Sequence, residues 1–506
     1  MIYNVLQYLE RSAERFPDKI ALGDEFGEIS YSEYERTAKI VGTYISKCVN
    51  GVTGAPVAVL IDRNIKSVCA FMGVVYSGNF YVPIDSTMPQ ERIDLIYKTL
   101  SPILTLDARS AEEETDAENT ASFTAAVSSG EIDEALLKKI RDNHIDTDPL
   151  YSTFTSGSSG VPKGVLICHR SVIDLVGSFE DAFSFSSEDV FGNQAPFDYD
   201  ASVKDIYNAM YMGATVQIIP KRCFKTPKLL LDYLQEKSIT TVVWAVSALR
   251  IVADFKALEG RELKLKNIMF SGEVMPVKSL NYWIDHVPEA RYVNLYGPTE
   301  ITCNCTYYVV DKSRRLRDDE KLPAGKAFRN CRVFLINDKG EKITKPDESG
   351  EICVEGACLS LGYWNNKEKT NEVFVSNPLI SAYNSGIYKT GDLGYYNDNN
   401  EIVFASRKDF QIKHMGHRIE LGEIEVALNA IPFLDVACCV YDSVKERIVC
   451  HYQADKDCKK EIVLALSKKL PKYMWPNIYI RHDALPLNKN GKIDRVKLKE
   501  ASQSQS

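Results

Sequence analysis

Short apolar runs alternate along most of the chain with stretches in which hydrophobic residues recur every three or four positions. The segments Lys66–Tyr76 and Pro227–Lys237 have this helical periodicity. The apolar runs have the length of strands and lie at Val57–Ile61, Phe80–Ile84, Thr215–Ile219, Thr240–Val246, Lys266–Ser271 and Arg291–Leu295. Buried strands separated by amphipathic helices predict a layered α/β architecture with mainly parallel sheets.

The alternation of apolar runs and amphipathic stretches is interrupted in two regions of the N-terminal four-fifths of the chain. Residues 106–149 are acidic and rich in Ala, Ser and Glu, which predicts a surface excursion with one helix at Ile132–Asp142. From about Leu322, short β segments with Gly and Asn turns predict a β-rich subdomain. These segments lie at Val333–Ile336, Gly350–Val354 and Ile402–Phe404.

The C-terminal part has a different pattern of predicted elements. It combines two helical segments, Leu421–Ile431 and Lys460–Leu470, with a strand pair, Val436–Tyr441 and Arg447–Gln453. This combination predicts a small α+β lobe. We therefore expect a large domain at 1–408, a small domain at 409–500 and a disordered tail at 501–506, where the sequence is of low complexity.

Composition excludes several classes of function. The 506 residues are 45% hydrophobic and 26% charged, and 61 basic against 69 acidic side chains give a net charge of −8, so no basic field would attract nucleic acid. Charges interrupt every apolar run before it could span a membrane, and no secretory signal is evident. The 13 scattered cysteines are typical of a reducing compartment, which predicts a cytoplasmic protein.

The segment Tyr151–Val165 has the chemistry of a phosphate-binding loop. The hydroxyls of Thr155, Ser156, Ser158 and Ser159 alternate with Gly157 and Gly160, and Lys163 follows. Glycines let backbone N–H groups converge on one point, where hydroxyls and an ammonium complete a cradle for phosphate oxygens. It is not a Walker loop, because Gly164 rather than Ser or Thr follows the lysine. A flexible linker is the alternative, but the apolar flanks favour a turn between two strands.

Three further motifs are weak when taken one at a time. Asn294–Glu300 turns at Gly-Pro and leaves Glu300 as a natural Mg²⁺ ligand, although a solvated turn has the same appearance. Tyr388–Asp392 ends in a Gly-Asp turn whose carboxylate can accept ribose hydroxyls. Asn488–Arg495 places Lys492 after an Asn-Gly turn, which matters only if a small lobe folds over the phosphate loop.

Taken together and in this order, the motifs resemble the adenylate-forming ligases: acyl-CoA synthetases, luciferases and the amino-acid adenylation domains of nonribosomal peptide assembly. The resemblance runs from Glu10–Lys19 through Gly350–Gly356, Gly362–Trp364 and Lys413–Glu423 to Lys492. The chain is most similar to free-standing D-alanine:carrier-protein ligases. This likeness rests on Pro196–Val203, Ser271–Val277 and Asp409–Lys413.

The resemblance implies two half-reactions, formation of an acyl-adenylate with release of pyrophosphate and transfer of the acyl group to a thiol. It implies ATP and Mg²⁺, with Glu300 as the metal ligand. The residues expected to bind ATP are Thr155, Ser156, Gly157, Ser158, Ser159, Gly160 and Lys163 at the phosphates, Thr299 beside them, Gly272, Asn294, Tyr296 and Gly297 near adenine, and Asp392 and Arg407 at the ribose.

Three residues are expected to act in catalysis. Lys492 would bridge the substrate carboxylate and the α-phosphate, where it stabilises developing charge. Asp409 would be the hinge about which the small lobe turns between half-reactions, and this turn would bring Lys413 to the active site. The acceptor would be the phosphopantetheine thiol of a separate carrier protein, although a domain excised from a megasynthase would have the same sequence.

The expected amino-acid pocket centres on Asp200, which in similar sequences pairs with the substrate amino group. Helix capping by Asp200 is the alternative. Lys204, one turn further, can neutralise Asp200 or Asp198, or meet an acidic substrate side chain. The whole expected set is Asp200, Ala201, Lys204, Trp244, Met269, Ser271, Leu295, Cys303 and Asn304.

The pocket departs from that of the D-alanine ligases. Ser271 replaces their stereoselective cysteine, and Lys204 and Trp244 replace smaller or apolar residues. D-alanine and a small polar or acidic amino acid therefore both stay open as substrates. Two other functions also stay open, a carboxylate:CoA ligase and a nucleotide-binding protein without turnover.

Overall fold

The computed structural model describes residues 2–111, 119–157, 160–318, 320–408, 411–487 and 493–504. The chain divides into two compact units. Unit 1 comprises 1–85, 101–153 and 164–408, and unit 2 comprises 86–100, 154–163 and 409–506. One of the divisions between the units falls at 408/409. Unit 2 contains, in addition, the expected phosphate loop and one helix of the N-terminal part.

The larger sheet of unit 1 has nine strands among the described residues, in the order β15-β14-β13-β12-β11-β9-β10-β1-β2. Pairs among β1, β9, β10, β11, β12 and β13 are parallel, as the continuous apolar runs predict. The strands are β1 (Ile20–Gly23), β2 (Glu28–Ser30), β9 (Val190–Asn193), β10 (Thr215–Ile218), β11 (Thr241–Ala245), β12 (Asn267–Ser271), β13 (Arg291–Tyr296), β14 (Thr306–Val309) and β15 (Lys326–Ala327).

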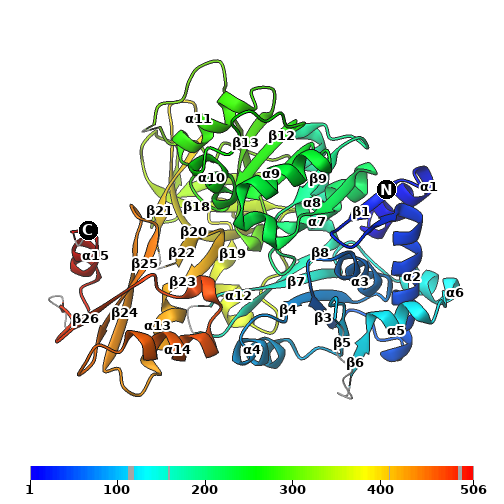
Figure 1. Ribbon diagram of the computed structural model, residues 1–506, viewed down its shortest axis with the longest axis horizontal. Helices are drawn as coiled ribbons and strands as arrows, with labels where there is room; N and C mark the ends of the chain where they lie inside the picture. The colour runs from blue at the N-terminus through cyan, green and yellow to red at the C-terminus, as the bar shows by residue number, and fades with distance from the viewer. Residues whose placement is uncertain are drawn as a thin grey trace. The chain divides into compact units, whose positions relative to one another are not determined.

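Helices cover both faces of this sheet (Figure 1). On one face, Val243, Met269 and Val293 pack with apolar residues of the helices α7 (His169–Phe183) and α8 (Ser202–Met212). On the other face, Trp244 and Phe270 pack with α9 (Pro227–Glu236), α10 (Val246–Asp254) and α11 (Val277–His286). Each of these strands therefore sends alternate side chains to two different cores.

The second sheet has the order β6-β5-β3-β4-β7-β8. Its strands are β3 (Pro56–Ile61), β4 (Phe80–Asp85), β5 (Leu104–Asp107), β6 (Thr120–Ser122), β7 (Pro149–Thr155) and β8 (Lys163–Cys168). The N-terminal helices of unit 1 are α1 (Leu6–Arg15), α2 (Tyr31–Cys48), α3 (Ile65–Tyr76), α5 (Phe123–Ser128) and α6 (Glu134–Asp142). Within the predicted 106–149 excursion, the described residues add elements that the sequence did not predict, because β6 extends this sheet in parallel with β5 before α5 begins.

The predicted β-rich subdomain is confirmed. Its sheet runs β17-β16-β18-β20-β19, with β21 paired to β20. The strands are β16 (Cys331–Ile336), β17 (Lys342–Ile343), β18 (Gly350–Gly356), β19 (Phe374–Ser376), β20 (Gly386–Tyr396) and β21 (Ile402–Arg407), and α12 (Lys367–Val373) precedes β19. Three short 3₁₀ helices among the described residues are η1 (Lys221–Lys225), η2 (Thr299–Ile301) and η3 (Lys472–Met474).

Unit 2 is an α+β body. A hairpin of β22 (Gln411–His414) and β23 (His417–Glu420) leads into α13 (Leu421–Asn429), and a second sheet runs β24-β25-β26. The remaining elements are β24 (Val436–Asp442), β25 (Arg447–Gln453), α14 (Lys459–Lys469), β26 (Ile478–His482), α15 (Arg495–Ser504) and, from the N-terminal part, α4 (Gln90–Leu100). Together, the layered sheets, the β-rich subdomain and this body confirm the predicted fold class.

The predicted disordered tail is wrong for residues 501–504, which belong to α15. Ser502 is buried, and its hydroxyl donates to the carbonyl of Leu498 at 2.7 Å and lies 2.9 Å from Nε2 of His451. The contact with His451, which is distant in sequence, ties this helical turn to β25. Residues 505 and 506 lie outside the described residues.

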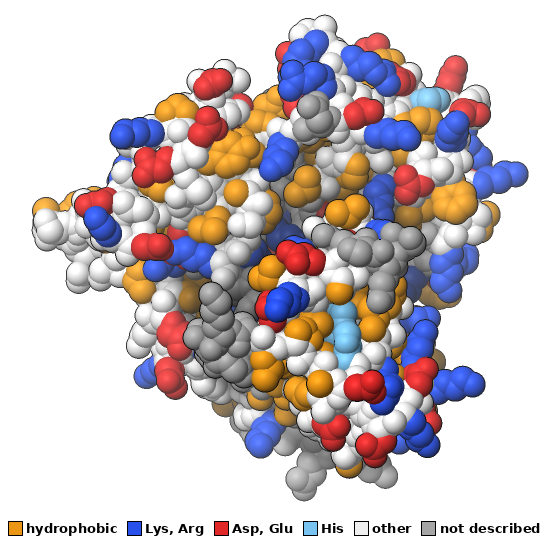
Figure 2. Space-filling model, turned by 90° about the vertical axis from the view of Figure 1, so that its left-hand side faces the viewer, with side chains coloured by type: hydrophobic (Ala, Val, Ile, Leu, Met, Phe, Trp, Pro, Cys, Tyr) orange, Lys and Arg blue, Asp and Glu red, His pale blue; other side chains and the backbone are white. Residues whose placement is uncertain are grey.

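No described helix combines the length and the apolar character needed to cross a bilayer. Acidic and basic side chains are interspersed over the face of the molecule that Figure 2 presents.

Candidate active site

The turn that follows β13 buries a carboxylate. At Gly297 a Cβ atom would lie 2.6 Å from Cα of Asn304, so only glycine fits where the chain folds back. Thr302 and Cys303 both have positive φ angles, 59° and 70°, which side chains rarely tolerate. The fold-back returns the chain to the sheet, where the N–H of Cys305 donates to the carbonyl of Tyr296 at 2.9 Å. It leaves Glu300 fully buried.

Glu300 is held at two points. The phenol of Tyr363 donates to Oε1 of Glu300 at 2.8 Å, and the N–H of Ser360 donates to its backbone carbonyl at 2.9 Å. No cluster of three or more His, Cys, Asp or Glu side chains that could hold a metal occurs in the described ranges. One carboxylate nevertheless fits Mg²⁺, which keeps waters and takes its other ligands from substrate phosphates.

A second carboxylate, Asp392, lies between an aromatic ring and a guanidinium. Asp392 and Arg407 face each other across β20 and β21, and Arg407 donates to Oδ1 of Asp392. The phenol of Tyr296 donates to Oδ2 at 2.6 Å. Burial and the neighbouring Asp392 hold the pKa of Tyr296 well above its usual value, so its hydroxyl remains a donor. Unit 1 therefore brings together the three residues expected at the nucleoside.

The other residues expected near adenine lie toward the carboxyl ends of β12 and β13. The side-chain amide of Asn294, in β13, donates to the carbonyl of Pro323 at 2.8 Å, which fixes its orientation. Gly272 follows β12 with a φ angle of 94°. Thr299 is buried in η2 beside Glu300.

The expected amino-acid pocket is formed where α8 begins. The thiol of Cys303 donates to the backbone carbonyl of Asp200 at 3.0 Å, and Nζ of Lys204 donates to Oγ of Ser271 at 3.2 Å. These contacts join the start of α8 to the carboxyl ends of β12 and β13, where ligands of α/β sheets commonly bind. The N-cap residue of α8 is Ala201, so the alternative in which Asp200 occupies that position is not observed.

Lys204 is a buried cation with a neutral partner. Its exposed fraction is 1%, and no ion pair to its ammonium is found within the part of the chain that the structure describes. The neutralisation by Asp200 or Asp198 considered from the sequence is therefore absent there. The neighbouring Asp205 interacts with Lys204 electrostatically but forms no ion pair with it among the described residues. A buried charge without a direct ion-pair partner is costly, so this position favours a ligand that brings an anion.

The prediction for Trp244 is corrected by the structure. Met269, Leu295 and Cys303 share one apolar core, whereas Trp244 belongs to the core on the opposite face of the sheet, where its indole donates to the carbonyl of Gly192 at 2.7 Å. The register pairs Trp244 with Phe270, which confirms the face. Its side chain cannot line a cavity with Met269. The neighbouring Val243 does share that core, and the sequence reasoning missed it.

Asn304 supplies an unsatisfied polar atom. It is 2% exposed, and its Oδ1 has no hydrogen-bond partner among the described residues. Buried polar atoms of native proteins are nearly always hydrogen-bonded, so an unsatisfied one beside Cys303 fits a pocket for a polar ligand.

The expected phosphate loop belongs to unit 2. At Gly157 a Cβ atom would lie 2.2 Å from the carbonyl oxygen of Val161, so the turn requires glycine. Gly160 has a φ angle of 81°. Oγ1 of Thr155 is buried and has no partner among the described residues, which fits a hydroxyl awaiting an oxygen ligand. Lys163 begins β8, while Ser158 and Ser159 lie outside the described residues.

The loop already binds a carboxylate of its own unit. The N–H of Gly157 donates to Oε2 of Glu423 at 3.2 Å, and Arg92 of α4 donates to Oε1. The hydroxyl of Ser156 donates to the carbonyl of Arg418 at 2.9 Å and accepts from the N–H of Glu420 at 3.2 Å. Burial raises the pKa of Glu423, and the Arg92 charge opposes the shift. Sequence reasoning assigned no role to Arg92 or Glu423.

Of the three residues expected in catalysis, the structure describes Lys413. Lys413 lies in β22, opposite Arg418 of β23. Asp409 and Lys492 lie outside the described residues.

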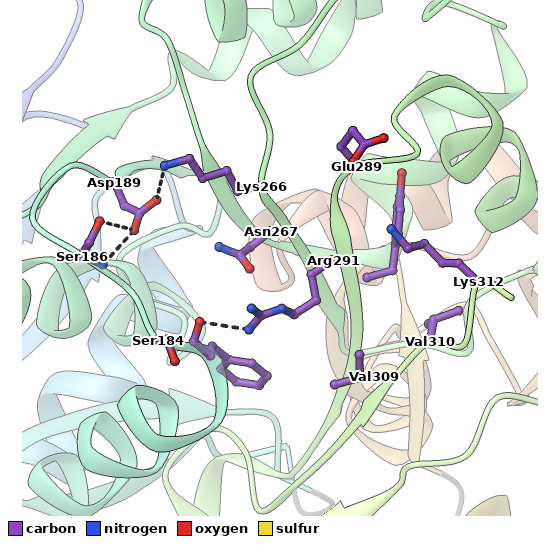
Figure 3. A pocket seen from close by; sticks show the side chains of 12 residues that line it. Ser184, Ser186, Asp189, Lys266, Asn267, Glu289, Arg291, Val309, Val310 and Lys312 are labelled. Carbon is purple, nitrogen blue, oxygen red and sulfur yellow. Dashed lines mark hydrogen bonds and ion pairs between the residues drawn. The ribbon is translucent and has the colours of Figure 1, made fainter.

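A separate cavity of about 380 Å³ lies at the opposite edge of the larger sheet, where β12 and β13 begin at Asn267 and Arg291. Figure 3 shows Arg291 reaching toward the end of α7, where it donates to the carbonyl of Phe183 at 2.9 Å. Lys312 donates to the carbonyl of Ala290 at 2.8 Å. Lys266, the third cation of the lining, lies 3.9 Å from Oδ1 of Asp189. Because these cations have partners within the protein and the predicted site residues lie at the other strand ends, this cavity is not the candidate site.

The family model of AMP-binding enzymes matches residues 9–364. The chain belongs to the AMP-binding enzyme family. This confirms the resemblance to the adenylate-forming ligases and makes the chain an enzyme of the adenylate-forming class.

Two curated relatives of this family are each 30% identical to the chain. D-alanine–D-alanyl carrier protein ligase of Bacillus licheniformis matches over 98% of the chain and 99% of its own length. Tyrocidine synthase 1 of Brevibacillus parabrevis matches over 99% of the chain but only 46% of its own length, so the chain spans about half of that relative.

A solved structure has the same fold. It is that of holo-PA1221, described as an NRPS protein containing adenylation and PCP domains bound to a vinylsulfonamide inhibitor. It superposes with a TM-score of 0.86, covering 98% of this chain and 84% of its own, at 23% sequence identity. At this identity the likeness supports the AMP-binding fold alone.

Proposed function

We propose that the chain activates an amino acid as its aminoacyl-adenylate, with release of pyrophosphate, and transfers it to the phosphopantetheine thiol of a carrier protein. The observation that carries the proposal is the joining of the start of α8 to the turn that holds Glu300, through Cys303 and the carbonyl of Asp200. A carboxylate for a substrate amine and a carboxylate for a metal then lie on adjoining segments. The full-length match to a ligase named for D-alanine and its carrier supports the same reaction.

The proposal extends to the substrate. Lys204 is buried, and its ammonium donates only to Ser271 among the described residues, so a substrate carboxylate would supply a direct ion-pair partner. We therefore favour an amino acid with a small acidic side chain over D-alanine. The side-chain oxygen of Asn304, which has no partner in the described ranges, is an acceptor and therefore suits the ammonium of the substrate rather than a carboxylate.

The chain's own residues fit ATP and Mg²⁺. Asp392, held by Tyr296 and Arg407, would accept ribose hydroxyls, and Thr155 and Gly157 would contact phosphate oxygens. Mg²⁺ held by Glu300 would neutralise phosphate charge. Lys492 would place its ammonium between the substrate carboxylate and the α-phosphate. This is catalysis by positioning and by electrostatic stabilisation.

The carrier protein and the location in the cell are further parts of the proposal. A phosphopantetheine thiol is the acceptor that the resemblance implies. All 13 cysteines are free in the structure, which suits work in the reducing cytoplasm.

The test is exchange of labelled pyrophosphate into ATP over both enantiomers of the common amino acids and over β-amino acids. We expect exchange with an acidic amino acid, and its loss in Lys492→Ala. Transfer is tested with a phosphopantetheinylated carrier added as a separate protein. Release of AMP with CoA and a fatty or aromatic acid would instead favour a CoA ligase. Absence of exchange with every acid would leave a nucleotide-binding protein without turnover.

A further inference from the structure

The segment Ser360–Trp364 links the buried Glu300 to strand β8. Its backbone pairs with β8 through Leu361 N–H to Leu166 O at 2.8 Å and Leu166 N–H to Gly362 O at 2.9 Å. The N–H of Trp364 donates to Gly164 O at 2.8 Å. This segment therefore runs beside the strand that follows the expected phosphate loop in the sequence.

The same segment forms two hydrogen bonds to Glu300. The N–H of Ser360 fixes the backbone carbonyl of Glu300, and the phenol of Tyr363 donates to its carboxylate oxygen Oε1 at 2.8 Å. Glu300 is fully buried and Tyr363 is 6% exposed. In such surroundings a hydrogen bond to a charged group is strong and its geometry is well defined.

Tyr363 is itself held in place. Its N–H donates to Oγ1 of Thr370 at 3.0 Å, and Tyr363 bridges to Val165 of β8. Its ring lies edge-on to that of Phe374, with centroids 6.2 Å apart. A carboxylate oxygen can only accept here, so the phenol hydroxyl is the donor of this hydrogen bond. The carboxylate plane of Glu300 is thus set by β8 through Tyr363.

We propose that Tyr363 is a positioning residue for the metal carboxylate, orienting Glu300 so that it can bind Mg²⁺ carried by the nucleotide. This inference rests on the proposed function, in which Glu300 is the metal ligand. Hydrogen bonds to ligating carboxylates orient them, and removing such a partner commonly costs 10- to 100-fold in metal affinity, on the order of what we expect here. A purely structural role would instead leave metal binding unchanged.

The experiment measures how strongly Mg²⁺ and nucleotide binding are coupled. The dissociation constant of α,β-methylene-ATP, which cannot react, is measured by calorimetry with saturating Mg²⁺ and again in EDTA. The metal coupling is the dissociation constant in EDTA divided by the constant with saturating Mg²⁺. In Tyr363→Phe we expect the ratio to fall by about tenfold, while the constant in EDTA stays the same.

Matched variants distinguish the loss of Glu300 orientation from a general effect of removing a buried hydroxyl. Tyr34→Phe removes a buried phenol oxygen that has no hydrogen-bond partner among the described residues, and it should leave the ratio unchanged. In a Glu300→Gln background, adding Tyr363→Phe should have no further effect, because Tyr363 acts through Glu300. Thr370→Val, which loosens the backbone of Tyr363, should lower the ratio by a smaller factor and replaces Tyr363→Phe if that variant does not fold.

Two results would overturn the proposal. A Tyr363→Phe ratio equal to that of the wild type would show that Tyr363 does not orient the metal ligand, and the proposed function would stand. Equal weakening with and without Mg²⁺ would show a structural role only. A wild-type protein whose nucleotide binding ignores Mg²⁺ is a different outcome, because it removes the metal role of Glu300 and with it the basis of this inference.

Discussion

The carboxylate of Glu423 accepts a hydrogen bond from the backbone N–H of Gly157, 266 residues earlier in the chain. Arg92 donates to the other carboxylate oxygen, and the side chains of Arg92 and Glu423 are 5% and 2% exposed. In the proposed function, the same N–H would bind a phosphate oxygen. A carboxylate of the protein and the triphosphate of ATP therefore compete for one donor.

Glu423→Gln is expected to tighten binding of α,β-methylene-ATP by about tenfold, because an amide oxygen is a weaker acceptor than a carboxylate. Binding of AMP, which lacks the β- and γ-phosphates, should not change. Calorimetry on both ligands makes the comparison. Glu461→Gln, at an exposed position of α14, controls for the change in net charge. Equal or weaker binding of α,β-methylene-ATP by Glu423→Gln would contradict the competition.

Substitutions at Val243 and Trp244 should separate the two faces of β11. Val243→Phe fills space beside Met269 and Leu295, so it should reduce exchange with longer amino acids more than with short ones. Trp244→Phe should lower stability by about 1–3 kcal/mol through lost packing and a lost hydrogen bond, with the substrate ranking unchanged. Pyrophosphate exchange and thermal unfolding of both variants provide the check. A changed ranking in Trp244→Phe alone would contradict the assigned faces.

Lys204→Ala is expected to lose acidic amino acids selectively. Removing one partner of a buried, hydrogen-bonded charge pair costs about 2–5 kcal/mol, which corresponds to a loss of roughly 30-fold or more in kcat/KM for these substrates. Exchange with alanine should change little, because alanine has no side-chain charge to pair. The measurement is kcat/KM over the same amino-acid panel. An unchanged ranking would refute the pairing.

Asp205 makes stability depend on pH. It is fully buried beside Asn193, and burial raises its pKa from 3.8 to about 7. The folded state therefore holds a proton that the unfolded state releases between these values, so stability falls as pH rises from about 4 to 7, by up to about 4 kcal/mol.

Asp205→Asn should remove this slope and be more stable than the wild type at pH 8, with little difference at pH 4. Thermal unfolding from pH 4 to pH 8 tests it, with the partly exposed Asp232→Asn as the control. Parallel pH profiles of the wild type and Asp205→Asn would show that the buried carboxyl does not titrate in this range.

The strands could be predicted because long apolar runs are unusual outside a buried sheet. The face of each side chain could not, since Thr240–Val246 is apolar on both sides, and only the register with β12 separates Val243 from Trp244. The last helix depends on contacts such as that between Ser502 and His451, which local sequence does not reveal.

The motifs located Glu300, Tyr296 and Asp392, but not their partners. Tyr363 belongs to the motif Gly362–Trp364, but nothing in the sequence gives a reason to assign it a role at the site. Glu423 had the appearance of an ordinary acidic residue in the first turn of a helix, because Gly157 and Arg92 are far away in the sequence.

Cys303 places a sulfur next to the residue proposed to recognise the substrate amine. An activated acyl group is readily captured by thiolates, and in the proposed function it passes to the sulfur of a carrier protein rather than to a cysteine of the enzyme. Burial and the nearby Asp200 raise the pKa of the Cys303 thiol well above its usual value. Kept protonated in this way, the internal sulfur is a poor nucleophile, and the enzyme is protected from acylating itself.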